Sequence, residues 1–255
     1  MLCCCVFLKK EKRDESMSRL FLVRHGQASF LQPDYDKLSA KGEAQSRLLG
    51  AYWSKHRLMF DATYSGPRKR QKDTARIVGE EYQKVGVPWP EPEILNCFDE
   101  FSAEAVMAHA LPELVESDAH VCALHQQFKK ASSKAEKFTT FQRVFEVVIS
   151  RWAAGQLLVP GIEPWPEFCV RVQRGLHELT ADGNRGRRIV VFSSGGPIGV
   201  AMQKSLGLTP EATLRSAWMV PNCSYSEFLF SGPRFTLSSY NAYPHLTDAE
   251  LHTYR

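Results

Sequence analysis

Residues 20–26, with the sequence LFLVRHG, constrain the fold of this chain more than any other segment. The first four residues are bulky and apolar, so a strand made from them needs cover on both faces. The run ends at Arg24, His25 and Gly26, which places a guanidinium and an imidazole where open α/β sheets bind ligands. Gly26 allows a sharp turn and the close approach of a ligand. This arrangement favours a phosphate site, although a buried strand that ends in ordinary surface polar residues has the same pattern.

The rest of the chain alternates predicted strands and helices, which is typical of a mostly parallel sheet covered on both faces. Strands are predicted at 19–24, 60–65 and 188–193, a further strand near 94–95, and a hairpin at 223–230 with 234–240. Helices are predicted at 40–56, from 66 or 67 to about 84, at 163–181 and from Pro197 onward, and the pattern over about 103–158 is helical throughout. Ser39 is expected to cap the first helix, and Ser65 or Gly66 the second, with Pro67 in its first turn.

Size and charge suit one α/β domain with an elaboration. The 255 residues are 44% hydrophobic and carry a net charge of +4, which is too mild and dispersed to indicate nucleic-acid binding. The seven cysteines form no CxxC pair and no Cys/His metal spacing, which predicts a reducing, cytoplasmic setting without disulfides. The apolar stretch 2–8 is short and its charges follow it, which is the wrong order for a secretory signal, and no later segment is long enough to span a membrane.

The first 16 residues stand apart from this domain. Met17 directly precedes the first predicted strand, so residues 1–16 are interpreted as a tail or as a start codon placed too far upstream. An anchor lipidated at Cys3, Cys4 or Cys5 is the alternative. A single domain is expected over 17–255.

Four further blocks follow the Arg-His-Gly segment in a specific order. They are LSAKGEAQSRLLG at 38–50, YSGPRKRQKDTA at 64–75, VVFSSGGPI at 190–198 and PNCS at 221–224. Together they resemble the histidine phosphatase superfamily, specifically its phosphoglycerate-mutase-like branch, from about residue 19 to about 246. The resemblance is weak only across about 101–162. It implies a three-layer α/β sandwich with a mostly parallel central sheet, helices on both faces and a helical cap insertion at about 101–162.

The resemblance also implies a set of catalytic roles. His25 would be the nucleophile that forms a phosphohistidine, and Arg24 and Arg70 would hold the phosphoryl oxygens and lower the pKa of His25. The proton donor would be Glu100, with Asp99 as the alternative, and neighbouring apolar rings would raise its pKa. A plain surface acidic pair is the other interpretation of these two residues. No metal and no organic cofactor is implied.

The chain departs from the family pattern at two positions. Ser194 stands where the family has a second histidine, and Leu31 where it often has asparagine. Ser194 and Gly195 are still expected to bind phosphate, because Gly195 and Gly196 lead into a predicted helix N-terminus, where amides and the helix dipole favour anions. Either Ser194 substitutes adequately, another residue supplies the charge, or catalysis is weak.

These observations predict a phosphatase that hydrolyses small phosphate monoesters, without nucleic-acid or membrane partners. The alternatives are a weak or inactive pseudo-enzyme that binds phosphorylated ligands or partners, and, less favoured, a phosphomutase. Substrate identity and oligomeric state are not indicated. His245 is expected near the site at best, and the apolar stripe on the helix around 138–152 to be core packing. Lysines that could meet a distal anion, although a solvated helix face is the commoner explanation, are Lys129, Lys130, Lys134 and Lys137.

Overall fold

The computed structural model describes residues 17–29 and 36–254. Residues 1–16 and Leu31, on which two of the predictions depend, lie outside this range. The strands are β1 (Ser18–Arg24), β2 (Ala62–Ser65), β3 (Glu93–Ile94), β4 (Arg188–Ser193), β5 (Tyr225–Ser231) and β6 (Arg234–Ala242). The helices are α1 (Ala40–Lys55), α2 (Lys69–Lys84), α3 (Ala103–Ser117), α4 (Ala119–Lys130), α5 (Lys134–Ala153), α6 (Trp165–Leu179), α7 (Gly195–Leu206) and α8 (Pro210–Trp218), with short 3₁₀ turns η1 (Asn96–Phe98), η2 (Asp182–Asn184) and η3 (Ala249–Leu251).

The six strands form one mixed sheet in the order β3-β2-β4-β1-β5-β6. Strands β1 to β4 run parallel to one another, whereas β5 is antiparallel to both β1 and β6. The register pairs Arg24, the last residue of β1, with Ser193, the last residue of β4. The segments that follow these two strands therefore start side by side at the carboxyl edge of the sheet.

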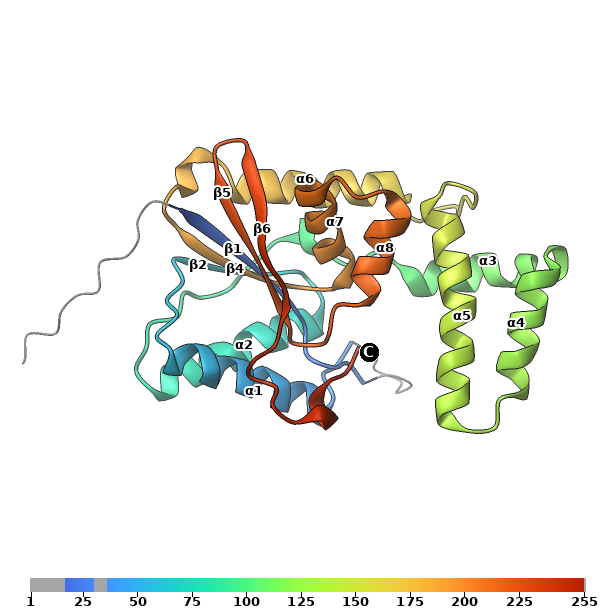
Figure 1. Cartoon of the computed structure of the whole chain (residues 1–255), viewed down its shortest axis with the longest axis horizontal. Helices are drawn as coiled ribbons and strands as arrows, with labels where there is room; N and C mark the ends of the chain where they lie inside the picture. Colours follow the sequence, from blue (N-terminus) through green and yellow to red (C-terminus); the bar gives the residue numbers. More distant parts are fainter. Residues whose placement is uncertain (1–16, 30–35, 255) are drawn as a thin grey trace, which may run out of the picture.

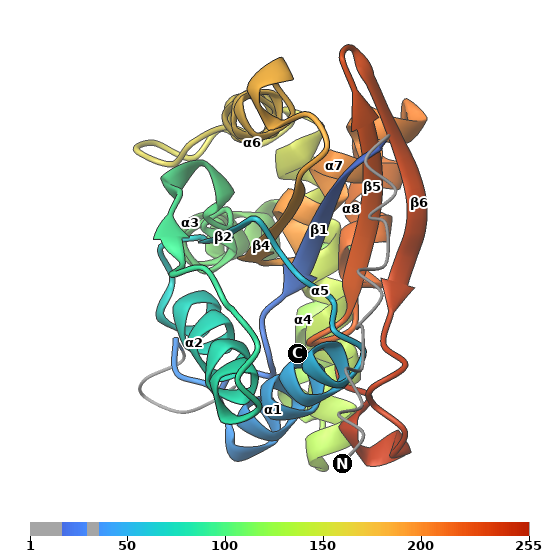
Figure 2. The same ribbon diagram turned by 90° about the vertical axis from the view of Figure 1, so that its left-hand side faces the viewer.

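Both faces of the sheet are covered, as the apolar run in β1 predicts. Phe21 and Val23 pack with α1 and α2 in one cluster, while Leu20 and Leu22 belong to a second cluster with α6 and α7. Figures 1 and 2 show α1 and α2 on one side of the sheet and α6 and α7 on the other. The predicted three-layer α/β architecture is confirmed.

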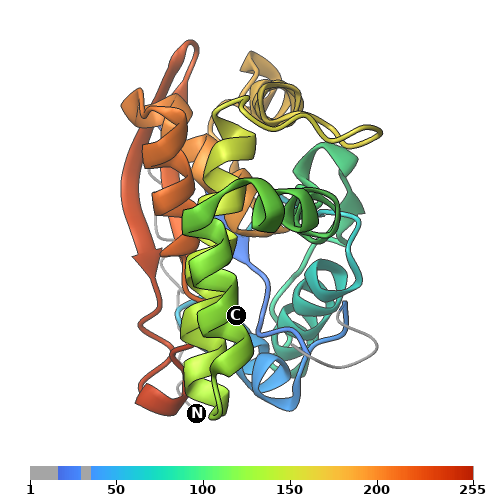
Figure 3. The same cartoon turned by 90° about the vertical axis from the view of Figure 1, so that its right-hand side faces the viewer.

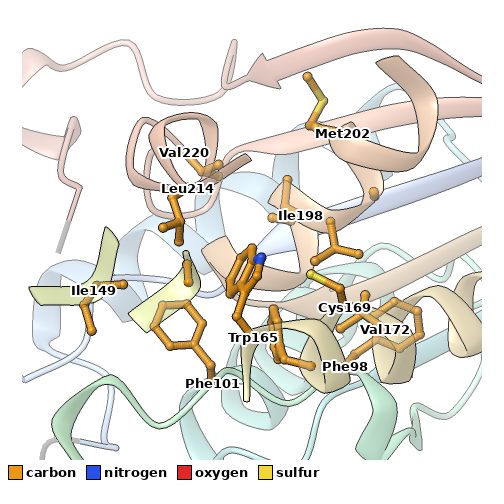
Figure 4. Packing of buried hydrophobic residues seen from close by; sticks show 14 of the residues in the cluster. Phe98, Phe101, Ile149, Trp165, Cys169, Val172, Ile198, Met202, Leu214 and Val220 are labelled. Carbon is orange, nitrogen blue, oxygen red and sulfur yellow. The ribbon is translucent and has the colours of Figure 1, made fainter. Parts of the chain in front are cut away.

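Helices α3, α4 and α5 follow β3 and η1 in the chain and project past one end of the sheet (Figure 1). Figure 3 shows this projection from its outer side, with α4 and α5 packed against each other. A shared apolar cluster joins it to the rest of the molecule, because Phe101 stacks on Trp152 of α5 and packs against Trp165 of α6. Figure 4 shows part of this cluster, with the Trp165 ring drawn between Phe101 and Ile198 of α7.

Two helix starts differ from the predictions. Helix α2 begins at Lys69 with Arg68 as its N-cap, and Pro67 lies before the helix. Neither Ser65 nor Gly66 is the cap, because the side chain of Gln71 turns back to accept the Arg68 N–H at 3.0 Å. Helix α7 begins at Gly195, two residues before Pro197. The Ser39 cap of α1 is confirmed, since its hydroxyl accepts the Gly42 N–H at 3.1 Å.

In the part of the chain that the structure describes, no helix is both long enough and apolar enough to cross a bilayer. The same residues contain no cluster of three or more histidine, cysteine or carboxylate side chains arranged to hold a metal ion. The four described cysteines, Cys97, Cys122, Cys169 and Cys223, are free thiols.

Candidate active site

His25 directly follows β1 and is held by backbone contacts from two neighbouring segments. Its N–H donates to the Ser193 carbonyl at 2.9 Å, and its carbonyl accepts from the side-chain amide of Asn222 at 3.2 Å. The next residue, Gly26, explains part of this arrangement. A Cβ on Gly26 would lie 2.4 Å from the carbonyl oxygen of Gly42, so the glycine allows the close approach of helix α1. The close approach predicted at this position is therefore made by a helix of the same chain.

The imidazole of His25 has an unprotonated Nε2 with a free lone pair for accepting a hydrogen bond. Its Nδ1 lies 2.7 Å from the Gly26 carbonyl oxygen. A carbonyl only accepts hydrogen bonds, so Nδ1 carries the hydrogen and Nε2 does not. Consistent with this, Nε2 accepts a hydrogen bond from Nε of Arg70 at 3.0 Å. Burial, followed by the charges of Arg70 and Arg24, holds the pKa of His25 well below its usual range, so the ring is neutral at pH 7.

Two guanidinium groups flank this neutral ring. Arg70 is only 4% exposed, and besides His25 it contacts Asp36 through Nη1 at 2.9 Å. Thr74 ties helix α2 to the His25 loop, because its hydroxyl accepts the Gly26 N–H and donates to the Arg70 carbonyl. Arg24 donates from Nη1 to the carbonyl of Val220. The pair supplies the concentrated positive charge that a phosphoryl group requires.

In the basic run 68–70, the family motif identifies only Arg70 as a site residue, and the sequence pattern therefore predicts that Arg68 and Lys69 are solvated helix residues. This is correct for Lys69, which pairs with Asp73 on the surface of α2. It is wrong for Arg68, whose half-buried side chain donates to Asp99 at 2.6 Å and to the Glu100 carbonyl at 3.3 Å. The Asp99 carboxylate therefore pairs with Arg68. Asp99 is also not among the residues that line the cavity described below.

Glu100 lies at the N-terminus of α7. Its Oε2 accepts the Gly196 N–H at 3.0 Å and its Oε1 accepts the Phe101 N–H at 3.1 Å. Burial raises the pKa of Glu100 above its usual range, against the opposing effects of the Gly196 hydrogen bond and the Arg70 charge. A Cβ on Gly196 would lie 2.0 Å from Oε1, so the carboxyl can occupy this place only because residue 196 is glycine. The helix terminus predicted to bind phosphate thus donates one of its amides to Glu100.

Ser194, the residue just before α7, is buried. Its hydroxyl accepts a hydrogen bond from Nε2 of Gln71 at 2.8 Å, and the residue is 1% exposed. Gly195 and Gly196 line the cavity, whereas Ser194 does not. Of the sequence-predicted site residues, the structure brings Arg24, His25, Arg70, Glu100 and Gly195 together around one space and leaves the Ser194 hydroxyl outside it.

This space is a cavity of about 440 Å³ that opens beside His25. Its other walls come from α3 and α5 and from two segments that the sequence does not indicate as part of a site, namely α8, with Trp218, and the C-terminal segment, with Tyr254. The C-terminal segment is held in place by Thr253, whose carbonyl accepts the Asn222 N–H at 2.7 Å and whose hydroxyl donates to the Asn222 side chain at 2.9 Å. Asn222 also binds the His25 carbonyl, so one residue connects the C-terminus to the candidate nucleophile.

The apolar stripe of α5 is divided between the core and this cavity. Val148 and Trp152 are buried as predicted, but Phe141 and Phe145 are half-buried and line the cavity, and Phe138 is 41% exposed. Phe141 and Phe145 also pack against the core, so the prediction of core packing is correct for part of their surface and is wrong only for the exposed Phe138. Helical periodicity identifies the shared face of these residues, but not whether protein or open space lies opposite them.

The remaining candidates lie elsewhere. His245 is buried between Tyr52 and Tyr225 and does not line the cavity. Lys129, Lys130 and Lys137 are exposed on α4 and α5 and are likewise absent from its walls. The Lys134 side chain lies outside the described set.

The fold and the cavity together define an α/β protein with a histidine-centred site at the carboxyl edge of a parallel sheet. A family model of the histidine phosphatase superfamily (branch 1) matches residues 20–157 and 147–243. The chain therefore belongs to this superfamily, as its motifs predict.

Solved structures share the fold at low sequence identity. A phosphoglycerate mutase from Bacillus anthracis superposes with a TM-score of 0.59 and 15% identity over 93% of this chain and 100% of its own. A mycobacterial glucosyl-3-phosphoglycerate phosphatase gives 0.55 and 19% over 88% and 98%, and Bacillus stearothermophilus YhfR gives 0.60 and 16% over 90% and 99%. No curated protein sequence matches the chain. At these identities the likeness shows the fold alone.

Proposed function

We propose that this protein hydrolyses phosphate monoesters through a phosphohistidine on Nε2 of His25. The observation that carries the proposal is the neutral, buried imidazole whose Nε2 lone pair faces a buried guanidinium. In the free protein that lone pair accepts the Arg70 Nε–H. A phosphoryl oxygen is a stronger acceptor for a guanidinium than a neutral imidazole, so a bound phosphate draws this N–H to itself and frees Nε2 for attack.

The reaction has two steps. Nε2 attacks phosphorus, the bond to the ester oxygen breaks, and Glu100 donates its proton to the leaving alcohol. Arg24 and Arg70 neutralise the charge on the phosphoryl oxygens, and the Gly26 carbonyl accepts the Nδ1 hydrogen of the phosphorylated ring. Water then attacks phosphorus while the Glu100 carboxylate takes its proton, and cleavage of the P–N bond returns neutral His25, protonated Glu100 and free phosphate. The two guanidinium groups provide the charge stabilisation that a metal ion supplies in other phosphatases, so the proposed reaction uses protein side chains alone.

The direct test is His25→Ala. We expect kcat/KM for phenyl phosphate to fall by roughly 10⁴-fold or more, because the nucleophile is lost. Rapid quenching of the wild type with a labelled ester should leave acid-labile, base-stable label on His25. The matched control is His120→Ala, an exposed histidine on α4 that should leave activity unchanged. Activity that survives His25→Ala would reject the proposal.

The proposed role of Glu100 is tested by comparing leaving groups. Alkyl phosphates need a proton on the departing oxygen, whereas phenolates leave readily without one. We expect Glu100→Gln to lower kcat/KM for alkyl phosphates by about 10²-fold or more and to affect aryl phosphates much less. The matched control is Asp99→Asn, which changes the neighbouring carboxyl and loosens the Arg68 contact. Dependence on leaving group in the Asp99 variant alone would assign the acid to Asp99.

A second candidate function is that of a pseudo-enzyme that binds phosphorylated ligands. The observation in its favour is the position of the Ser194 hydroxyl, which is bound to Gln71 and absent from the cavity wall. The site then has one charged donor fewer than the family pattern, and loss of one such donor lowers rates by roughly 10²–10³-fold. Calorimetric binding of phosphate or vanadate, without turnover of any ester, would favour this candidate.

A further inference from the structure

The cavity is lined by two chemically different groups of residues. One group is polar and charged and contains His25, Arg24, Arg70 and Glu100. The other group is apolar and comes from three separate helices, with Met107 of α3, Phe141 and Phe145 of α5, and Trp218 of α8.

The aromatic side chains of the apolar group, Phe141, Phe145 and Trp218, contact one another and form an aromatic wall. The rings of Phe141 and Phe145 lie 6.0 Å apart between centroids, and Phe145 meets the Trp218 ring at 6.4 Å and 62°. All three are half-buried rather than covered by other parts of the described chain. Binding is favoured when a ligand removes the apolar surface of a cavity from water, so this wall favours an apolar group next to the phosphate.

The charges around the cavity restrict that ligand further. Among the described residues that line it, the only arginine or lysine side chains are Arg24 and Arg70, both beside His25. The phosphoryl group itself engages these two. The lining also contains the carboxylate of Glu104, which is exposed in the first turn of α3, and the phenol of Tyr254, which is neutral at pH 7 by its ordinary chemistry. Among the described lining residues, a second anionic group on the substrate would find no cation besides Arg24 and Arg70. Arg68, which interacts with the charge of Glu104, is already paired with Asp99 at 2.6 Å.

Resting on the proposed function, we propose that the substrates are monoesters of an uncharged, apolar or aromatic alcohol in which the phosphate is the only anionic group. The aromatic wall binds the alcohol portion and Glu104 disfavours a carboxylate or a second phosphate. Phosphorylated carboxylic acids and bisphosphates are then poor substrates.

The test uses esters with matched leaving groups. We expect kcat/KM to rise about threefold to fourfold per methylene from ethyl to butyl to hexyl phosphate, because each buried methylene contributes that factor. The phosphate ester of 6-hydroxyhexanoic acid releases a primary alcohol of similar pKa to hexanol, but its chain ends in a carboxylate. We expect its kcat/KM to be at least about tenfold lower than that of hexyl phosphate, because the charged end of the chain loses the binding contribution of about two methylenes. A flat alkyl series, or a carboxylated ester that reacts faster than hexyl phosphate, would overturn the proposal.

Variants identify the responsible residues. Phe145→Ala and Trp218→Ala should flatten the dependence on chain length, whereas Phe138→Ala, on the same helix but off the cavity, should retain it. Glu104→Gln should bring the carboxylated ester closer to hexyl phosphate, and Glu113→Gln, an exposed carboxylate farther along α3, should not. Retention of the full chain-length dependence in both aromatic variants would reject the wall as its cause.

Binding of non-hydrolysable alkylphosphonates separates this proposal from the proposed function. If the protein turns over no ester, calorimetry should still give affinities that rise threefold to fourfold per methylene from ethylphosphonate to hexylphosphonate. Equal affinities along that series would refute the substrate class whether or not the protein is an enzyme.

Discussion

The close contact between Gly196 and Glu100 leads us to predict that Gly196→Ala displaces the Glu100 carboxyl. The new Cβ would lie 2.0 Å from Glu100 Oε1 and 3.0 Å from ring carbons of Phe101 and Phe168. Non-bonded heavy atoms pack best near about 3.5 Å, so the carboxyl must move by about 1.5 Å. The carboxyl is the end of a flexible side chain and can move, but the proposed acid is then out of place. A misplacement of about 1 Å can cost roughly 10²-fold in rate.

We therefore expect Gly196→Ala to lower kcat/KM for alkyl phosphates by about 10²-fold and to affect aryl phosphates less. Crowding against the two rings costs about 1–3 kcal/mol of the free energy of unfolding, partly offset by the higher helix propensity of alanine. Urea denaturation of the same preparation measures that cost separately. Gly183→Ala is the matched control, because a Cβ at Gly183 meets no atom within 4 Å.

The double variant Gly196→Ala/Glu100→Gln examines whether the loss acts through Glu100. If it does, the double variant is no slower on alkyl phosphates than Glu100→Gln alone, since the acid is already absent. Additive losses would refute this reasoning, as would a Gly196→Ala enzyme with wild-type rates on alkyl phosphates.

Three further predictions concern other parts of the molecule. Arg70→Ala should lower kcat/KM by roughly 10²–10³-fold and Ser194→Ala by less, and equal losses in activity would give the serine a direct catalytic role. Ser194→Ala also removes one hydrogen bond of the buried Gln71 amide, which keeps its weaker contact with the Phe98 carbonyl, and should cost about 1 kcal/mol of stability. Burial lowers the pKa of His245 to about 4, so the free energy of unfolding is unaffected by this histidine's titration above pH 6.5 and declines by about 3 kcal/mol as the pH falls toward 4. Urea denaturation across this pH range should show a shallower decline for His245→Gln. Tyr254→Ala should raise KM for hexyl phosphate about fivefold with a smaller effect on kcat, and an unchanged KM would mean that the ring does not contact the substrate.

The parts of the fold that follow from local pattern could be predicted from the sequence. The run at 20–23 is apolar at every position, and the structure buries alternate residues under opposite helix layers. The polar residues that end β1 and begin α7 meet because parallel strands place their carboxyl ends at one edge. The strand pattern alone places Arg24 and His25 at this edge, whereas the expectation for Gly195 comes from the resemblance to the family and from the predicted helix N-terminus.

The residues that the sequence analysis missed are brought to the cavity by contacts between distant segments. Tyr254 reaches it because Thr253 hydrogen-bonds Asn222, a pairing that no local pattern signals. Phe145 belongs to a regular helical stripe that would look the same if protein covered it. Likewise, the hydroxyl of Ser194 could face either the cavity or Gln71, and only the packed structure distinguishes these orientations.

The serine at position 194 also affects the neighbouring carboxyl. Glu100 binds the amide of Gly196, two residues farther along the chain, and the charges of Arg70 and Arg24 already oppose the rise in its pKa. An imidazolium at position 194 would add a further positive charge and would lower the pKa of Glu100 more. A neutral serine thus removes one charged donor from the proposed phosphoryl site and at the same time favours the protonated form of the proposed acid. The two effects act on different parts of the reaction, since binding of the phosphoryl oxygens is weakened while proton transfer to a poor leaving group is helped. An enzyme with this composition should show its deficit mainly on aryl esters, which need the charge but not the proton.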